Sequence, residues 1–325
     1  MDAAFKVCVR CFTYNHANYI ENALNGFTMQ ETTFPYICAI VDDASSDGEP
    51  EKIEHYLKNH FDIIDGSGQY LNIETDDYRM IYARHKINPN CFFAVYLLKY
   101  NHYRAKKNKM QYIAEWCDNA PYIAICEGDD FWIDSSKLQK QFDYMSGHPN
   151  CTMCCHNAYW LTIGEDNNSA KLFNNYNSDR DLSIEDVISH WVIPTASVMV
   201  KRDYNINPSW MPAVYCGDFA RILNCINEGD IHFLSIIASV YRYNVLKNSS
   251  SLSSMHNSMD IMNAHYKLLV GFAEKASPEF KNVLDHRIKE LDDSIKLHTY
   301  LAEKRYGKLL LNSLLVLRTL WGKIR

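Results

Sequence analysis

The sequence is poor in glycine and proline, with 12 and 9 residues among 325, and it has no excess of positive charge. A chain that is 47% apolar and 22% charged, with so few turn formers, has the composition of a globular protein. The net charge of −6 gives no electrostatic reason to expect a nucleic-acid partner. The length suits one large α/β domain, alone or with a helical appendage.

Features of secreted and zinc-binding proteins are also missing. No signal peptide precedes the first expected strand, Lys6–Phe12, and the eleven cysteines are scattered through expected strands. We therefore expect reduced thiols and a cytoplasmic location. Cys8 with Cys11, and the cysteines at 151–155, could be halves of a zinc site, but neither group has a matched partner pair. We interpret them as small packed hydrophobes.

Two strand–turn–helix units begin the chain. The first is a strand at 7–12 followed by an amphipathic helix with Asn18 as its N-cap. The second is a strand at 36–41 followed by a helix from about residue 51. This order predicts right-handed βαβ connections and a parallel sheet. Residues 66–103 lack firm periodicity, and we expect a loop region there with one short strand or helix.

Strands and helices continue to alternate beyond this region. Residues 165–181 form a polar, Asn-rich excursion, and from about Ser258 onward the pattern is helical. We expect one α/β domain at 1–254 and a helical extension at 255–325. Further helices are expected at 109–119, after 135 and at 219–228. Further strands are expected at 152–159, 196–201 and 238–243.

The most informative segment is an apolar strand that starts at Tyr122 and ends in three carboxylates, Glu127, Asp129 and Asp130. Ligands of α/β sheets bind just beyond the carboxyl ends of the strands. Carboxylates crowded there repel one another unless a cation neutralises them, and hard oxygen ligands favour Mg²⁺ or Mn²⁺. A metal held by one or two carboxylates keeps coordination sites open for nucleotide phosphates. The alternative is a solvated acidic turn.

Two other motifs precede this strand in a fixed order. The chain reads Thr-Tyr-Asn at 13–15, Asp-Asp-Ala-Ser-Ser-Asp-Gly at 42–48 and Cys-Glu-Gly-Asp-Asp-Phe-Trp at 126–132. Together the motifs resemble the family 2 glycosyltransferases of the GT-A fold. The last motif, with Lys-Leu-Gln-Lys-Gln at 137–141, is similar to a bacterial branch that carries CEGDDYW. The resemblance covers about residues 5–245 and implies a mostly parallel central sheet flanked by helices.

The resemblance implies a binding site for a nucleotide-diphosphate sugar, with UDP as the expected nucleotide. Thr13, Tyr14 and Asn15 follow the first strand, where a base can stack on an aromatic face. Asp42 or Asp43 would accept the uracil N–H or a ribose hydroxyl.

The same resemblance assigns the acidic strand. Glu127 stands at the first position of the family's DxD motif, where it would contact the ribose with a longer arm than the usual Asp. Asp129 is the expected metal ligand, with Asp130 as the alternative ligand or as a sugar contact. Lys107 matches a basic stretch of similar enzymes and would offset phosphate charge; a solvated basic turn is the alternative.

Later residues supply the expected base and close the site. An inverting transfer needs a group that removes the proton of the acceptor hydroxyl, and Asp218 matches the family's late acidic motif. Its alternative role is a helix cap. Arg242 lies in a segment that resembles the strand closing the site. The His that often follows there is absent, and Arg242 or His256 would have to compensate.

The predicted function is therefore a metal-dependent (Mn²⁺ or Mg²⁺), inverting hexosyltransferase that uses a UDP-sugar. Its acceptor would be a glycan or a lipid-linked glycan in bacterial surface polysaccharide biosynthesis. The alternative is a catalytically inactive GT-A-fold protein that binds glycans or nucleotides. A nucleotidyltransferase is disfavoured, because residues 13–16 are not a Gly-rich loop with a basic residue.

The C-terminal residues 304–325 carry six Lys/Arg and no acid among many leucines. This apolar run is too short and too interrupted to cross a bilayer. A basic amphipathic helix of this kind suits the inner face of an anionic membrane. Docking on the α/β domain or on a second copy in a homo-oligomer is the equal alternative.

Overall fold

The computed structural model describes residues 4–64, 70–164, 169–213, 216–244 and 258–303. The chain forms two compact units. The first comprises residues 1–182, 192–205 and 229–250, and the second comprises 183–191, 206–228 and 251–325. The domain boundary expected after residue 254 lies outside the described residues and stays a prediction.

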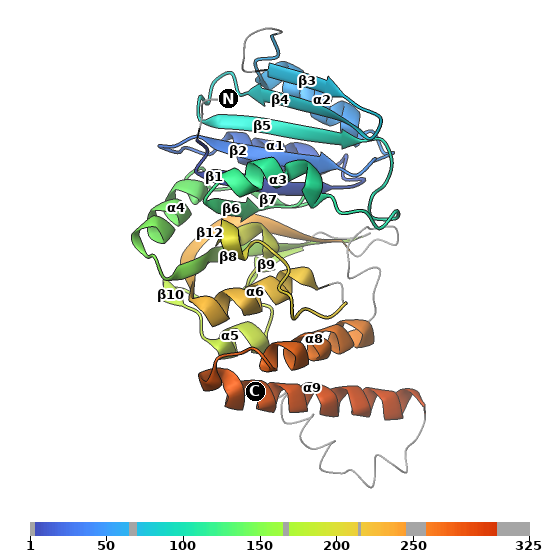
Figure 1. Cartoon of the computed structure of the whole chain (residues 1–325), viewed down its shortest axis with the longest axis vertical. Coiled ribbons are helices and arrows are strands. Elements are labelled where there is room, and N and C mark those ends of the chain that lie inside the picture. Colours follow the sequence, from blue (N-terminus) through green and yellow to red (C-terminus); the bar gives the residue numbers. More distant parts are fainter. Residues whose placement is uncertain (1–3, 65–69, 165–168, 214–215, 245–257, 304–325) are drawn as a thin grey trace. The chain divides into compact units, whose positions relative to one another are not determined.

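One mixed sheet organises the first unit (Figure 1). Its strands follow the order β10-β12-β8-β11-β6-β1-β2-β5-β4-β3. The centre is parallel, as predicted, because β1 pairs in parallel with β2 and β6, and β2 pairs in parallel with β5. The bounds of these strands are β1 Val7–Thr13, β2 Tyr36–Asp42, β5 Cys91–Leu98 and β6 Tyr122–Ile125.

The prediction of a loop region for 66–103 is wrong. This stretch contains β3 (Tyr70–Glu74), β4 (Tyr78–Arg84) and β5, of which β3 and β4 pair antiparallel at the sheet edge. Every residue of β5 is buried, so its apolar run shows no alternation. In β3 the consecutive side chains of Asn72, Ile73 and Glu74 are all exposed, so the strand shows neither alternating nor continuous burial.

The other half of the sheet is built on one long pairing. β8 (Cys151–Ile163) runs parallel to β12 (Asp230–Asn244) with register shifts along its length. Both strands are longer than predicted. β11 (Met199–Lys201) is preceded by a 3₁₀ turn at Thr195–Ser197 and followed by another at Arg202–Tyr204, so the strand expected at 196–201 is shorter. The short strands β7 (Phe131–Trp132), β9 (Ser169–Leu172) and β10 (Arg180–Asp181) pair with β12, β8 and β12.

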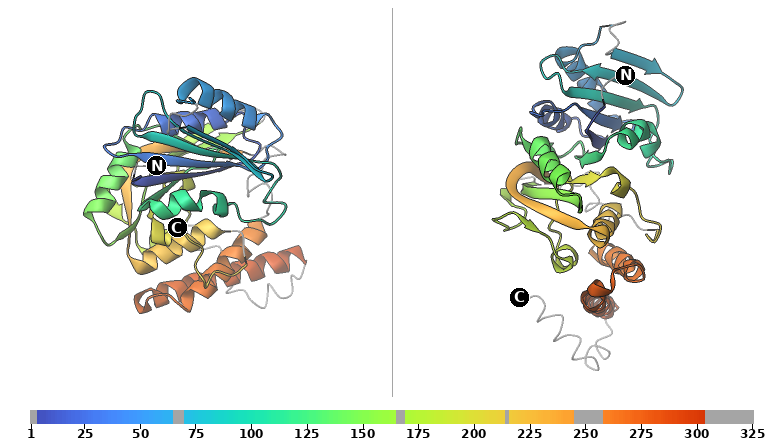
Figure 2. Two further views of the ribbon diagram at one scale, coloured as in Figure 1. Left: turned by 45° about the horizontal axis from the view of Figure 1, so that its top comes forward. Right: turned by 60° about the vertical axis from the view of Figure 1, so that its left-hand side comes forward.

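Helices cover both faces of the central strands (Figure 2). Val9 and Cys11 of β1 join a core that α1 (Ile20–Thr28), α2 (Glu49–His60) and α4 (Lys137–Gly147) share. Cys8 points to the opposite face, where its Sγ lies 3.6 Å from that of Cys117 in α3 (Met110–Asn119). The predicted cap of α1 is wrong: Tyr19 is the N-cap and makes no side-chain cap bond, while Asn18 is exposed.

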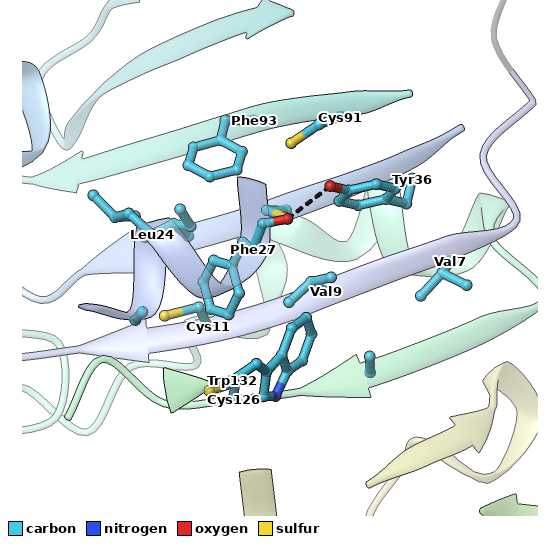
Figure 3. Packing of buried hydrophobic residues seen from close by; sticks show 14 of the residues in the cluster. Val7, Val9, Cys11, Leu24, Phe27, Tyr36, Cys91, Phe93, Cys126 and Trp132 are labelled. Carbon is cyan, nitrogen blue, oxygen red and sulfur yellow. Dashed lines mark hydrogen bonds between the residues drawn. The ribbon is translucent and has the colours of Figure 1, made fainter. Parts of the chain in front are cut away.

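Aromatic rings fill the core between β1, β2, α1 and β7 (Figure 3). The ring of Phe27 packs edge-on against Trp132 at 5.0 Å, and the Tyr36 hydroxyl donates to the Phe27 carbonyl at 2.7 Å. All eleven cysteines are buried and none forms a disulfide, and Cys11, Cys91 and Cys126 belong to this core (Figure 3). Burial raises the pKa of the Cys11 and Cys126 thiols well above the usual value.

The second unit is helical. It contains α5 (Ile184–Ser189), α6 (Gly217–Glu228), α8 (Ser258–Ala273), a 3₁₀ turn at Pro278–Phe280 and α9 (Lys281–Ala302). Arg287 of α9 donates from Nε to the Ile188 carbonyl at 3.0 Å and so ties α9 to α5. The predicted helical pattern after residue 258 is confirmed up to residue 302. Within the described ranges no helix is long and apolar enough to span a membrane, and residues 304–325 lie outside them.

Candidate active site

The acidic turn, residues 126–130, lies directly against the end of β1. Gly128 donates its backbone N–H to the Phe12 carbonyl at 3.1 Å. A Cβ atom at Gly128 would lie 2.0 Å from Thr13 Oγ1 and 2.5 Å from Thr13 Cβ. The turn therefore approaches β1 more closely than any residue with a side chain would allow.

Glu127 is attached to the same strand. Its Oε2 accepts from the Phe12 backbone N–H at 3.1 Å, and its Oε1 lies 3.8 Å from Arg10 Nη2. Burial raises the pKa of this carboxyl, and the charge of Arg10 partly opposes the shift. About a third of the side chain stays exposed, at 31%. Glu127 is thus fixed by its strand neighbours and still reachable.

Asp130 and Arg242 hold the turn from the side of β12. Asp130 Oδ1 accepts the Arg242 backbone N–H at 2.8 Å, and the carboxyl is buried. Burial, followed by the charge of Asp129, raises its pKa well above the usual value. The Arg242 guanidinium donates to the Asp129 carbonyl and to Asn22 Oδ1, the latter at 2.8 Å, and lies over the Phe131 ring. The side chain of Arg242 is therefore a brace for the acidic turn.

The side chain of Asp129 is partly exposed, at 28%, while its backbone carbonyl accepts from Arg242. Its Oδ2 lies 3.7 Å from Nε2 of His16, in the loop after β1. Sequence reasoning did not select His16. The sequence feature that could have identified His16 is its position directly after the Thr-Tyr-Asn motif.

Asp42 ends β2 in a buried position. Its Oδ1 accepts from the Ser45 backbone N–H at 3.1 Å, whereas Oδ2 is buried and has no hydrogen-bond partner among the described residues. Burial raises the pKa of this carboxyl to about 7. Asp42 therefore has one carboxylate oxygen without a protein partner among the described residues.

Asp43 is occupied by its own chain. Its Oδ1 accepts from the His102 N–H at 2.6 Å, and its Oδ2 accepts from the Tyr103 N–H and from Lys109 Nζ, both at 3.1 Å. These bonds pin the segment before α3 to the end of β2. Lys107, the predicted phosphate contact, is exposed and donates to the Tyr100 hydroxyl.

A buried carboxylate that sequence reasoning missed joins the loops after β1 and β2. Glu49 Oε1 accepts from the Thr13 hydroxyl, and its Oε2 accepts from the His16 backbone N–H and the Ser45 hydroxyl, both at 2.9 Å. Asn15 adds a second link, because its N–H donates to Ser45 Oγ at 2.8 Å. Its φ of 55° is a conformation that asparagine tolerates. Glu49 was detectable only as the residue after the Asp-Asp-Ala-Ser-Ser-Asp-Gly run.

The remaining predicted residues are placed as follows. Tyr14 is half-buried in the loop after β1. Asp218 belongs to the second unit, in the first turn of α6, where its Oδ1 accepts from the Phe219 N–H at 2.9 Å. His256 lies outside the described residues. The first unit itself carries the other candidates: Thr13, Tyr14, Asn15, Asp42, Asp43, Lys107, Glu127, Asp129, Asp130 and Arg242.

The donor atoms of the site fit a divalent cation that a ligand helps to bind. In the described part of the chain, no three His, Cys, Asp or Glu side chains form a metal-binding group. The partly exposed Asp129 oxygen and the nearby His16 nitrogen are ligand types that suit Mn²⁺. Mg²⁺ and similar ions commonly use one or two protein ligands and complete their shell with phosphates and water.

Comparisons with known proteins give the fold a context. No family model matches the chain. Uncharacterised proteins of Mycobacterium bovis (Mb1547) and Mycobacterium tuberculosis (Rv1520) are 30% identical over 230 residues, or 71% of this chain. The chain spans 56% of the length of these relatives.

Two solved structures share the architecture at 14% identity. S. aureus TarS in complex with UDP matches with a TM-score of 0.53 over 95% of this chain and 75% of its own. The mannosyltransferase PcManGT from Pyrobaculum calidifontis, in complex with GDP-Man and Mn²⁺, matches with a TM-score of 0.52 over 98% and 84%. The predicted GT-A fold, with its C-terminal helices, is confirmed.

Proposed function

We propose that this chain is a family 2 glycosyltransferase that transfers a sugar, with inversion, from a nucleotide-diphosphate sugar. UDP is the proposed nucleotide. The proposed acceptor is a glycan or lipid-linked glycan of a bacterial surface polysaccharide. The observation that carries the proposal is the acidic turn: three carboxylates meet at the end of the central strands, and only Asp130 among them is fully buried.

The residues of the first unit have distinct proposed roles in binding the donor. Asp42 would accept an N–H of the base through Oδ2, and Tyr14 would stack on the base. Glu127, held by the backbone of β1, would accept a ribose hydroxyl. Asp129 would hold the diphosphate end through a shared cation, with Arg242 keeping the turn in position. A bound Mn²⁺ or Mg²⁺ would supply Lewis-acid stabilisation to the leaving diphosphate.

The proposed chemical step needs one further protein group. The acceptor oxygen forms a bond to the anomeric carbon while the bond from that carbon to the diphosphate oxygen breaks. The proton of the acceptor hydroxyl goes to the carboxylate of Asp218.

Two substitutions test this division of roles. Asp129→Ala removes a carboxylate while the backbone carbonyl that Arg242 binds remains, so the fold is expected to survive. We expect it to abolish the Mn²⁺-dependent binding of UDP in calorimetry. Asp218→Asn is expected to leave UDP binding unchanged and to lower the rate of sugar transfer by about 100-fold or more.

Asp143→Ala, an exposed carboxylate on α4, is the matched control and should behave like the wild type. Equal loss of UDP binding in the Asp129 and Asp218 variants would contradict the assignment. A wild-type protein that binds donors with metal but neither hydrolyses nor transfers them would support the inactive binding protein instead.

A further inference from the structure

Arg10 is a charged residue in the middle of the central strand β1. The strand reads Val-Cys-Val-Arg-Cys-Phe-Thr, and Arg10 is buried like most of its neighbours. Strands at the centre of a parallel sheet are commonly continuous apolar runs, because both of their faces are covered. An arginine keeps its charge in proteins, so this position buries a permanent cation. Such a group needs a partner for its charge.

The contacts of the guanidinium only partly offset the cost of its burial. Its Nη2 lies 3.8 Å from Glu127 Oε1, and its Nη1 donates to Asn205 Oδ1 at 3.4 Å. Its Nε is buried and has no hydrogen-bond partner among the described residues. A buried ion pair with such long contacts contributes little to stability, since the desolvation of both charges opposes it.

The same ion pair fixes the carboxylate of Glu127. Its Oε2 accepts from the Phe12 N–H at 3.1 Å and its Oε1 is attracted by Arg10, so β1 holds both oxygens. A separation of 3.8 Å is too long for a hydrogen bond, and Oε1 therefore keeps its lone pairs for another donor. The side chain of Glu127 is 31% exposed, whereas that of Arg10 is 9% exposed. A ligand can thus reach the carboxylate more readily than the cation.

We propose that Arg10 is a positioning residue that makes the site selective for a ribose, acting through Glu127. This inference rests on the proposed function, in which Glu127 accepts a ribose hydroxyl. Because the cation holds Oε1 in advance, the carboxylate does not have to be ordered when the hydroxyl binds. A nucleotide without that hydroxyl loses a hydrogen bond to a charged acceptor, which is stronger than one to a neutral acceptor.

The affinity ratio between deoxy-UDP and UDP tests the proposal without relying on catalysis. The dissociation constants of UDP, 2′-deoxy-UDP and 3′-deoxy-UDP are measured by calorimetry on the full-length protein with Mn²⁺. For the wild type we expect one of the deoxynucleotides to bind about tenfold or more weakly than UDP. Arg10→Met removes the charge and is expected to lower this ratio to about threefold or less.

Arg84→Met in β4 is the matched control. Arg84 also lies in a strand of the sheet and has a buried Nε without a partner among the described residues. Its variant should keep the wild-type ratio. If Arg10→Met does not fold, Arg10→Lys replaces it. One ammonium group cannot contact Asn205 and Glu127 as the planar guanidinium does, so the ratio should still fall by about twofold or more.

A double variant shows whether Arg10 acts through Glu127. Glu127→Gln keeps the shape of the side chain and removes the charge that Arg10 holds, so its ratio should fall as in Arg10→Met. Arg10→Met combined with Glu127→Gln should show no further fall, because two residues that act as one unit are not additive. The double variant buries no charge here and should be at least as stable as the wild type in urea unfolding.

The outcomes separate this inference from the proposed function. If UDP does not bind with Mn²⁺, or binds equally well to Asp129→Ala, the proposed function fails. If UDP binds and depends on Asp129, but the Arg10 variants keep the wild-type ratio, only the role of Arg10 is refuted. Equal binding of UDP and both deoxynucleotides to the wild type would also refute it. A further fall in the double variant would overturn the action through Glu127.

Discussion

Gly128 is the residue at which the site has the least space. Gly128→Ala would place a methyl group 2.0 Å from Thr13 Oγ1, so the acidic turn or the end of β1 has to shift. We expect a loss of about 1–3 kcal/mol in the free energy of unfolding, and a loss of UDP binding. Gly147→Ala is the control, because a Cβ there meets nothing within 4 Å, and alanine is the better helix former at the end of α4. Urea unfolding and calorimetry measure both effects. An unchanged Gly128 variant would show that the turn is not closely packed.

The sequence indicated which carboxylates gather at this site but not which way each one faces. Asp42 and Asp43 are neighbours with the same side chain. Both carboxylate oxygens of Asp43 accept hydrogen bonds from the segment at 102–109. One oxygen of Asp42, in contrast, has no partner among the described residues. This difference depends on a loop about 60 residues away in the chain. Local sequence cannot specify such a contact, and for the same reason Glu49 and His16 were overlooked.

Helix α4 carries a buried lysine beneath the site. Lys137 Nζ donates to Gln141 Oε1 at 2.7 Å and lies 4.1 Å from the centre of the Trp132 ring, and burial lowers its pKa to about 7. Between about pH 7 and pH 10 the unfolded chain therefore binds one more proton here than the folded chain does. Stability then rises with pH across this window, by roughly 1.4 kcal/mol per pH unit from this residue.

Lys137→Met removes the amine that titrates in this window, and with it the contribution of this residue to the pH dependence of stability. We expect the difference in unfolding free energy, wild type minus variant, to rise with pH from 7.5 to 9.5 in urea titrations. Other groups, such as the buried thiols, cancel in the difference. Lys140→Met on the exposed side of the same helix is expected to give a flat difference. A flat difference for Lys137 as well would mean that its ammonium stays charged inside the protein.

At the scale of elements, periodicity found the helices that cover the sheet and the parallel strands of its centre. Periodicity did not identify β5, because this strand is buried on both faces and its apolar residues therefore do not alternate with polar ones. It also missed the length of β12, since the half of that strand paired with residues 151–157 contains no clear alternation. Strand pairing of this kind is decided by distant partners rather than by local preference.

Across the whole molecule, every cysteine is a packed side chain. All eleven thiols are buried and none forms a disulfide, and burial raises the pKa of Cys8, Cys11 and Cys154 well above the usual value. We expect the native protein to react with none of the eleven within minutes in a thiol-titration assay at pH 8, and with all of them in denaturant. Rapid labelling of several thiols in the native protein would contradict this packing.

One contact at the acidic turn joins two parts of the chain that are synthesised at different times. Asp130 is held by the backbone of a residue 112 positions later in the chain. At a synthesis rate of about 5–20 residues per second, the turn leaves the ribosome roughly 6–22 s before the residue that fixes it. A chain that ends before Arg242 therefore lacks the hydrogen bond that holds Asp130 in place.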